Sequence, residues 1–176
     1  GSTAFVYKKY FKHLNTAGIS MLYVGSVRTF FETNYSSVYF GIYIDRDNGG
    51  KLGVRVSSSA NIAKIADELK ATGKVDMAYI NIQPSKMPSY ANAEYMRGIT
   101  HNMLTKYLEL PEEQRDLIRL RAANYDPQSD MVIVEIVKLD AAAQQAFEQY
   151  IAKADYITVS GSFTAAKNDT IKVTLT

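Results

Sequence analysis

The sequence contains no cysteine, no tryptophan and only two histidines, His13 and His101. Without cysteine, the chain has no disulfide framework, no cysteine-based zinc site and no thiol nucleophile. Two histidines exclude a three-histidine metal centre and leave few general bases that titrate near neutral pH. We therefore predict no catalytic residues, no metal site and no cofactor, and the sequence favours a protein that is not an enzyme.

Long hydrophobic runs are also missing. No apolar run approaches the roughly 20 residues that a membrane-spanning helix needs, so we expect no membrane insertion by this chain. Gly1 and Ser2 are typical of residues left by cloning, and a signal peptide or anchor removed in that step would leave no trace. The sequence therefore makes no prediction of the compartment.

Charge of either sign is modest. The chain of 176 residues has a net charge of +2, which is too small to indicate a polyanionic partner unless the positive charges cluster. The hydrophobic share of 47% and the charged share of 22% are typical of globular proteins. No repeat or linker divides the chain. After the two residues attributed to cloning, 1–2, we expect one globular domain over residues 3–176.

Apolar periodicity and turn residues predict the element order α-β-β-β-α-β-α-α-β-α-β-β. Helices are expected over 4–14 and 90–110, and between a cap at Ser59 and a stop at Gly73 with Ile65 and Leu69 on the inward face. Two more are expected, one with Pro111 as its first residue that includes Leu120, and one from a cap at Asp140 to residue 154 with Tyr150 inward. Strands are expected over 19–27, 38–44, 52–57, 75–83, 131–137, 157–164 and 170–175, with 131–137 at the sheet centre. Hairpins near both ends favour an α+β fold with a mixed, mainly antiparallel sheet and helices packed against it.

Tyrosine is the one strong skew in composition, with 13 residues. Tyr35, Tyr39 and Tyr43 share one parity along the segment 35–44, whereas the apolar residues of the strand share the other. Because alternate residues of a strand point to opposite faces, the apolar set suffices for a core and the tyrosines are expected on the other face. Arg55, on the next hairpin strand, has the parity that places it beside them. We predict a contact surface here, with ordinary packing against another helix or subunit as the alternative.

These observations favour a non-enzymatic binding or assembly domain. Its partner is predicted to be another protein or a second copy of the chain, contacted through the tyrosine-rich sheet face or a free sheet edge. The strand 170–175 offers such an edge if it lies at the border of the sheet, because Lys172 is its only charge.

Two other classes of function stay open at this point. Tyrosine rings and Arg55 on an open sheet are what the stacking of unpaired bases requires, and a basic arm of Lys8, Lys9 and Lys12 can contact a nucleic-acid backbone. The alternative function is therefore single-stranded nucleic-acid binding. A hydrolase with two convergent carboxylates would have to draw on scattered acids, namely Glu94, Glu135 and Glu148.

Overall fold

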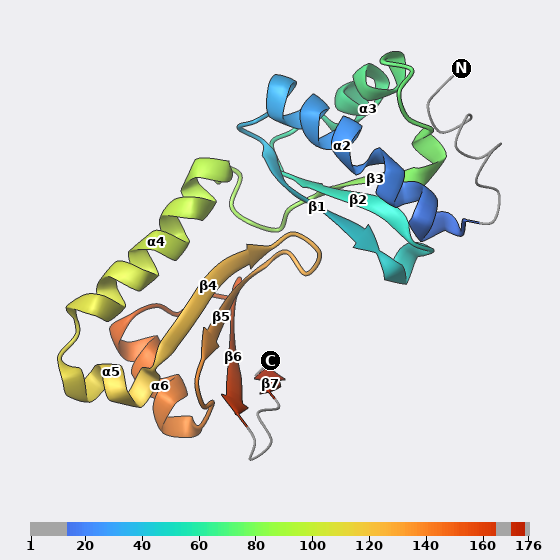
Figure 1. Cartoon of the computed structure of the whole chain (residues 1–176). Coiled ribbons are helices and arrows are strands. Elements are labelled where there is room, and N and C mark those ends of the chain that lie inside the picture. The colour runs from blue at the N-terminus through green and yellow to red at the C-terminus, as the bar shows by residue number, and fades with distance from the viewer. Residues whose placement is uncertain (1–13, 165–169, 175–176) are drawn as a thin grey trace. The chain divides into compact units, whose positions relative to one another are not determined.

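The computed structural model describes residues 14–164 and 170–174. The helix expected over 4–14 lies, apart from Leu14, outside the described residues. The fold class is α+β, as predicted, with strands in two mixed sheets of order β1-β2-β3 and β4-β5-β6-β7 in which antiparallel pairs outnumber parallel ones. Residue contacts define two compact units (Figure 1). Unit 1 contains the described residues up to Glu94 together with Pro127–Asp130, and unit 2 contains Tyr95–Asp126 and the described residues from Met131 onward.

Unit 1 consists of helices packed on one face of a three-stranded sheet. Its elements are α2 (Thr16–Asn34), β1 (Tyr39–Asp45), a 3₁₀ turn η1 (Arg46–Asn48), β2 (Lys51–Val56), α3 (Ile62–Ala71), a second 3₁₀ turn η2 (Met77–Tyr79) and β3 (Ile80–Pro84). β1 pairs antiparallel with β2, and β2 pairs parallel with β3. Figure 1 shows α2 and α3 beside this sheet, and their buried side chains share one core with those of β2.

The first helix of unit 1 corrects the prediction of a strand over 19–27. Asn15 caps α2, because its side-chain oxygen accepts a hydrogen bond from the Gly18 amide at 2.8 Å. Ile19, Tyr23 and Val27 are all buried and recur every four residues, which is the spacing of one helix face. β-branched and aromatic residues favour a strand in this segment, but its buried residues have the period of a helix.

The other elements of unit 1 agree with the prediction, apart from the start of one helix and of one strand. The predicted hairpin 38–44 and 52–57 is confirmed as β1 and β2, and Ile65 and Leu69 of α3 are buried as expected. The cap of α3 is Asn61 rather than Ser59, since the Asn61 side chain accepts from the Lys64 amide. The strand expected over 75–83 begins only at Ile80, because η2 occupies the residues before it.

Unit 2 contains a four-stranded sheet and the remaining helices. The elements are α4 (Ala93–Glu109), α5 (Glu112–Ile118), β4 (Leu120–Asp126), β5 (Met131–Ile136), α6 (Ala141–Tyr150), β6 (Ile157–Thr164) and β7 (Thr170–Thr174). Its buried side chains include Ile118, Phe147 and the three alternate residues Val132, Val134 and Ile136 of β5. β5 lies inside the sheet, as predicted for the segment 131–137.

Three details of unit 2 differ from the prediction. β4 was not expected, because the predicted helix from Pro111 includes Leu120. The left-handed backbone of Arg119 (φ 50°) instead ends α5 at Ile118, and β4 begins at Leu120. Pro111 is the cap of α5 rather than its first residue. Asp140 caps α6 as predicted, but Tyr150, expected to face inward, is 39% exposed.

The two units repeat one topology, although the sequence shows no repeat. In each, a helix precedes a hairpin of seven and six residues, a helix of ten residues follows, and the next strand pairs parallel with the second hairpin strand. The registers also agree, because Leu52 pairs with Ile80 in unit 1 and Val132 pairs with Ile157 in unit 2. Unit 2 adds α5 and β7 to this plan.

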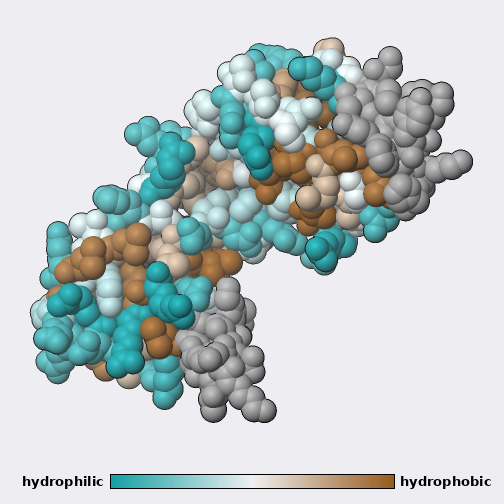
Figure 2. Space-filling model, in the orientation of Figure 1, coloured by the Kyte–Doolittle hydropathy of each residue, from teal (hydrophilic) through white to brown (hydrophobic). Residues whose placement is uncertain are grey.

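None of the helices within the described ranges combines the length and the hydropathy that crossing a membrane requires. Figure 2 shows hydrophobic residues at the surface of both units. The large exposed ones include Met21 of α2 and Leu108 of α4.

Candidate functional site

The three tyrosines predicted to form one row lie in different environments. Tyr35 is not in a strand but is the C-terminal cap of α2. Its ring contacts Phe30 and Phe31 at centroid distances of 5.9 and 6.5 Å, and its hydroxyl donates a hydrogen bond to Glu68. This hydrogen bond to a carboxylate raises the pKa of the Tyr35 hydroxyl above its usual value.

Tyr39 packs against the core of unit 1 because of a bulge at the start of β1. Tyr39 pairs with Val56 and Gly41 with Arg55, so Phe40 is an extra residue that shifts the parity of the strand. Cross-strand partners share a face, and Tyr39 therefore lies on the core side with Val56. Its ring stacks on Phe31 with centroids 5.3 Å apart. Burial raises the pKa of the Tyr39 hydroxyl, and the nearby Arg28 guanidinium opposes that rise.

Tyr43 lies on the opposite face of the sheet, as predicted. It pairs with Gly53, and its ring covers that glycine so closely that a Cβ atom added there would lie 2.3 Å from the ring. The Tyr43 hydroxyl donates to Gln83 Oε1 of β3 at 3.1 Å. The ring therefore spans the sheet from β1 to β3 over a strand position that has no side chain.

Arg55 lies beside Tyr43, as predicted, but is buried, with 8% of its surface exposed. Its guanidinium donates to the backbone oxygens of Pro84, Pro127 and Gln128 at 3.0 to 3.1 Å and lies 5.7 Å from the Tyr43 ring centroid. A second contact fixes the same segment to unit 1, since the Asp130 carboxylate accepts a hydrogen bond from the Ser85 hydroxyl at 2.6 Å. Arg55 thus holds the Pro127–Asp130 segment of unit 1 on the sheet face.

The described residues of the predicted site therefore do not form one surface. The structure brings Tyr43 and Arg55 together and places Tyr35 and Tyr39 on the core side. Lys8, Lys9 and Lys12 lie outside the described residues. Stacking of bases needs accessible rings, and no observation here favours the nucleic-acid alternative, which stays a prediction.

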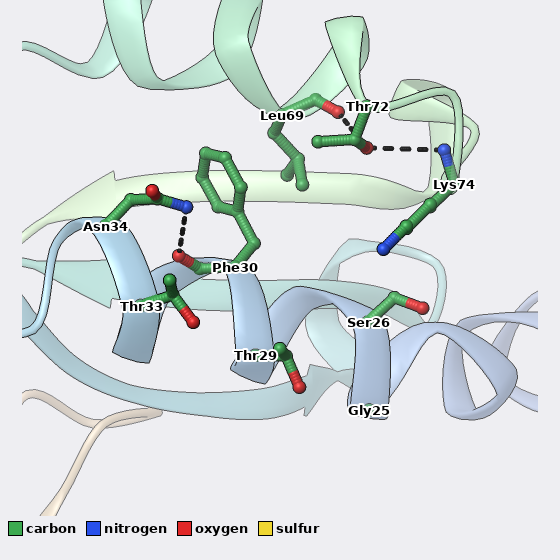
Figure 3. Close-up of a pocket in the computed structure, with 9 residues that line it drawn as sticks. All are labelled: Gly25, Ser26, Thr29, Phe30, Thr33, Asn34, Leu69, Thr72 and Lys74. Carbon is green, nitrogen blue, oxygen red and sulfur yellow. Dashed lines mark hydrogen bonds between the residues drawn. The ribbon is translucent and has the colours of Figure 1, made fainter.

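A groove between α2 and the end of α3 was not predicted (Figure 3). It has a volume of about 370 Å³, and its lining comprises Gly25, Ser26, Thr29, Phe30, Thr33, Asn34, Leu69, Thr72 and Lys74. Phe30 and Leu69 form an apolar floor, and the α2 wall carries hydroxyl side chains. The signal in the sequence was the spacing of Ser26, Thr29 and Thr33, which is that of one helix face and which the assignment of a strand obscured.

The polar groups of the groove are only partly used within the protein. The Thr72 hydroxyl donates to the Leu69 oxygen at 2.7 Å, and the Asn34 amide donates to the Phe30 oxygen at 3.0 Å. Lys74 extends from the loop after α3 toward α2, and no acid of the described chain forms an ion pair with it. The groove therefore offers one cation, several hydroxyls and an apolar floor to a ligand.

No cluster of metal-ligating residues occurs in the part of the chain that the structure describes. No protein-family model matches the sequence, and no curated protein matches it with significant similarity.

Proposed function

We propose that the chain is a non-enzymatic assembly domain that contacts another protein chain, such as a second copy of itself, by strand addition at a sheet edge. The single observation that carries the proposal is the position of β7. β7 pairs antiparallel with β6 in a regular register, and no described strand pairs with its other side. A strand of this kind presents a row of backbone donors and acceptors to an incoming chain.

The other sheet edges carry features that oppose strand addition. β1 and β4 each have a register shift near their first residue, and bulges twist an edge away from a partner strand. β3 ends in Pro84, which has no backbone N–H to donate. β7 has neither a register shift nor a proline, and Lys172 is its only charge.

Single proline substitutions at neighbouring positions test the proposal. Adjacent residues of a strand direct their N–H groups to opposite sides, so one of Ile171→Pro and Lys172→Pro removes an outward donor and the other removes a donor to β6. We expect sedimentation velocity to show association that rises with the concentration of the unmodified chain. One of the two variants should stay folded and lose that association.

The dependence of association on salt concentration is the second part of the test. Association through backbone hydrogen bonds depends weakly on ionic strength, whereas binding to a nucleic acid weakens steeply with salt. Two results would reject assembly through β7. One is a chain that remains monomeric at every concentration, and the other is association that both proline variants retain.

A further inference from the structure

We propose that the groove between α2 and α3 binds a small polyhydroxylated anion of the sugar-acid or sugar-phosphate class. This inference is independent of the assembly proposed for β7. It rests on the shape and the lining of the groove and on a comparison with the corresponding groove of unit 2.

The two units have grooves at equivalent positions, each between the first helix and the loop that follows the second helix. In unit 1 the first helix contributes Ser26, Thr29, Phe30 and Thr33, among others. In unit 2 the residues with the same spacing on α4 are Ile99, Asn102, Met103 and Lys106. Phe30 and Met103 are both buried, which shows that the two helices have the same rotation about their axes relative to their own core.

Unit 2 fills its groove with its own side chains. Lys106 donates across it to the Ile151 oxygen at 3.3 Å, and Ile99 stands where unit 1 has Ser26. The volume that remains is about 150 Å³. Small-molecule sites usually enclose about 300–1,000 Å³, so the groove of unit 1, at about 370 Å³, falls in that range and the groove of unit 2 does not.

The lysines after the second helices also differ. Lys74 and Lys153 each lie three residues beyond the last residue of that helix, Ala71 in α3 and Tyr150 in α6. Lys153 forms an ion pair with Glu148 at 3.9 Å, whereas Lys74 has no acidic partner within the described ranges. The groove of unit 1 is thus the larger of the two, and its lysine has no ion-pair partner among the described residues.

The lining determines the chemistry of the ligand. Among the described residues that line the groove, Lys74 is the only charged one, so an anionic group is favoured at the α3 end. Ser26, Thr29 and Thr33 are spaced by three and four residues along α2, which places their hydroxyls in a row that can donate to and accept from neighbouring hydroxyls of a ligand. The Phe30 ring supplies an apolar surface for the carbon skeleton. A carboxylate and a phosphate are both compatible with the single ammonium group.

The experiment is a titration of the ¹⁵N-labelled full chain followed by heteronuclear NMR. The probes are gluconate and glucose 6-phosphate, with glucose as the neutral control and acetate as the anion without hydroxyls. We expect gluconate, glucose 6-phosphate or both to shift the amides of residues 25–34 and 72–74 at millimolar concentration, and glucose and acetate to bind more weakly. The two anions distinguish a carboxylate site from a phosphate site.

Two variants and one matched control identify the groove. Lys74→Gln should raise the dissociation constant about tenfold, the effect expected for the loss of one charge-assisted hydrogen bond. Ser26→Ile copies the residue of unit 2 and should abolish binding by filling the groove. Lys70→Gln removes the same charge from the exposed last turn of α3, outside the lining, and should leave the dissociation constant unchanged.

Three results would overturn the proposal. The first is the absence of shifts in the groove with either anion. The second is equal binding of acetate and the polyhydroxylated anions, and the third is an equal loss of affinity in Lys74→Gln and Lys70→Gln. If Ser26→Ile disturbs the folded spectrum, the pair of lysine variants alone decides the outcome.

Discussion

Phe40 determines the environment of the tyrosines on either side of it. As the extra residue of the β1 bulge, it turns Tyr39 to the core face and leaves Tyr43 on the opposite face. The Tyr39 ring then stacks on Phe31 and is partly buried against the core of unit 1. The inserted residue therefore determines that Tyr39, and not Tyr43, places its ionisable hydroxyl on the core side of the sheet.

The raised pKa of Tyr39 predicts a loss of stability at alkaline pH. A tyrosine whose folded-state pKa lies above its unfolded value of about 10 contributes stability that is present below that pH and lost as the pH rises through the folded pKa. Tyr39→Phe keeps the stacked ring and removes the ionisable hydroxyl. We expect the free energy of unfolding to change by about 1 kcal/mol or less at neutral pH and to decline less steeply above pH 10.

Urea unfolding at a series of pH values measures this effect. Tyr150→Phe removes a hydroxyl from an exposed position and serves as the control. Tyr23 and Tyr35 also have raised pKa values, so part of the alkaline decline should remain in Tyr39→Phe. An alkaline decline identical in the variant and the unmodified chain would show that Tyr39 ionises without cost in the folded state.

At the scale of elements, the packing of β1 on β2 depends on a glycine that faces an aromatic ring. Gly53→Ala would place a Cβ atom 2.3 Å from the Tyr43 ring, so the ring has to move from its position over β2. That movement disturbs its hydrogen bond to Gln83 and its contact with Arg55. We expect the free energy of unfolding to fall by about 1–3 kcal/mol, the cost of overpacking a close contact.

Equilibrium denaturation compares this variant with a glycine that has free space around it. Gly98→Ala lies inside α4, and an added Cβ atom there meets no atom within 4 Å. That substitution should raise the stability by about 0.5–1 kcal/mol, because alanine favours the helix. Equal effects of Gly53→Ala and Gly98→Ala would mean that the Tyr43 ring does not constrain the hairpin.

The sequence predicts elements well where its periodicity has a single interpretation. β1, β2, β5 and β6 follow strand-forming runs, and Asp140 marks the start of α6. The segment 19–27 was assigned to a strand because β-branched and aromatic residues occur there, whereas its buried residues recur with a helical period. β4 is rich in alanine and polar residues, which gives no clear strand pattern.

The site was predictable only in part, because its geometry depends on residues distant in the sequence. The parity of Tyr43 and Arg55 placed them correctly on one face, but nothing local indicates that Arg55 binds Pro127 and Gln128, more than 70 residues away. The bulge at Phe40 likewise follows from the pairing with β2 and not from β1 alone. The groove could not be predicted either, because its hydroxyl residues lie in a row only when the segment is a helix, and the sequence predicts a strand there.

At the scale of the molecule, the repeated topology raises the question of whether the two units unfold together. Each has its own fully buried apolar residues, among them Val54 in unit 1 and Val134 in unit 2, which occupy equivalent strand positions. The chain passes from one unit to the other three times, after Glu94, after Asp126 and after Asp130. Three crossings restrict the independent opening of either unit, and we propose that residues 3–176 behave as one cooperative domain, as predicted from the length of the chain.

Matched core substitutions test this cooperativity. Val54→Ala and Val134→Ala each remove two methyl groups from a fully buried site and should each lower the free energy of unfolding by about 1–3 kcal/mol. In one cooperative domain, either substitution increases the amide hydrogen exchange of the most protected residues in both sheets by the same free energy, since those amides exchange through global unfolding. If Val54→Ala accelerates exchange only in β1–β3 and Val134→Ala only in β4–β6, the units unfold separately and the chain consists of two domains.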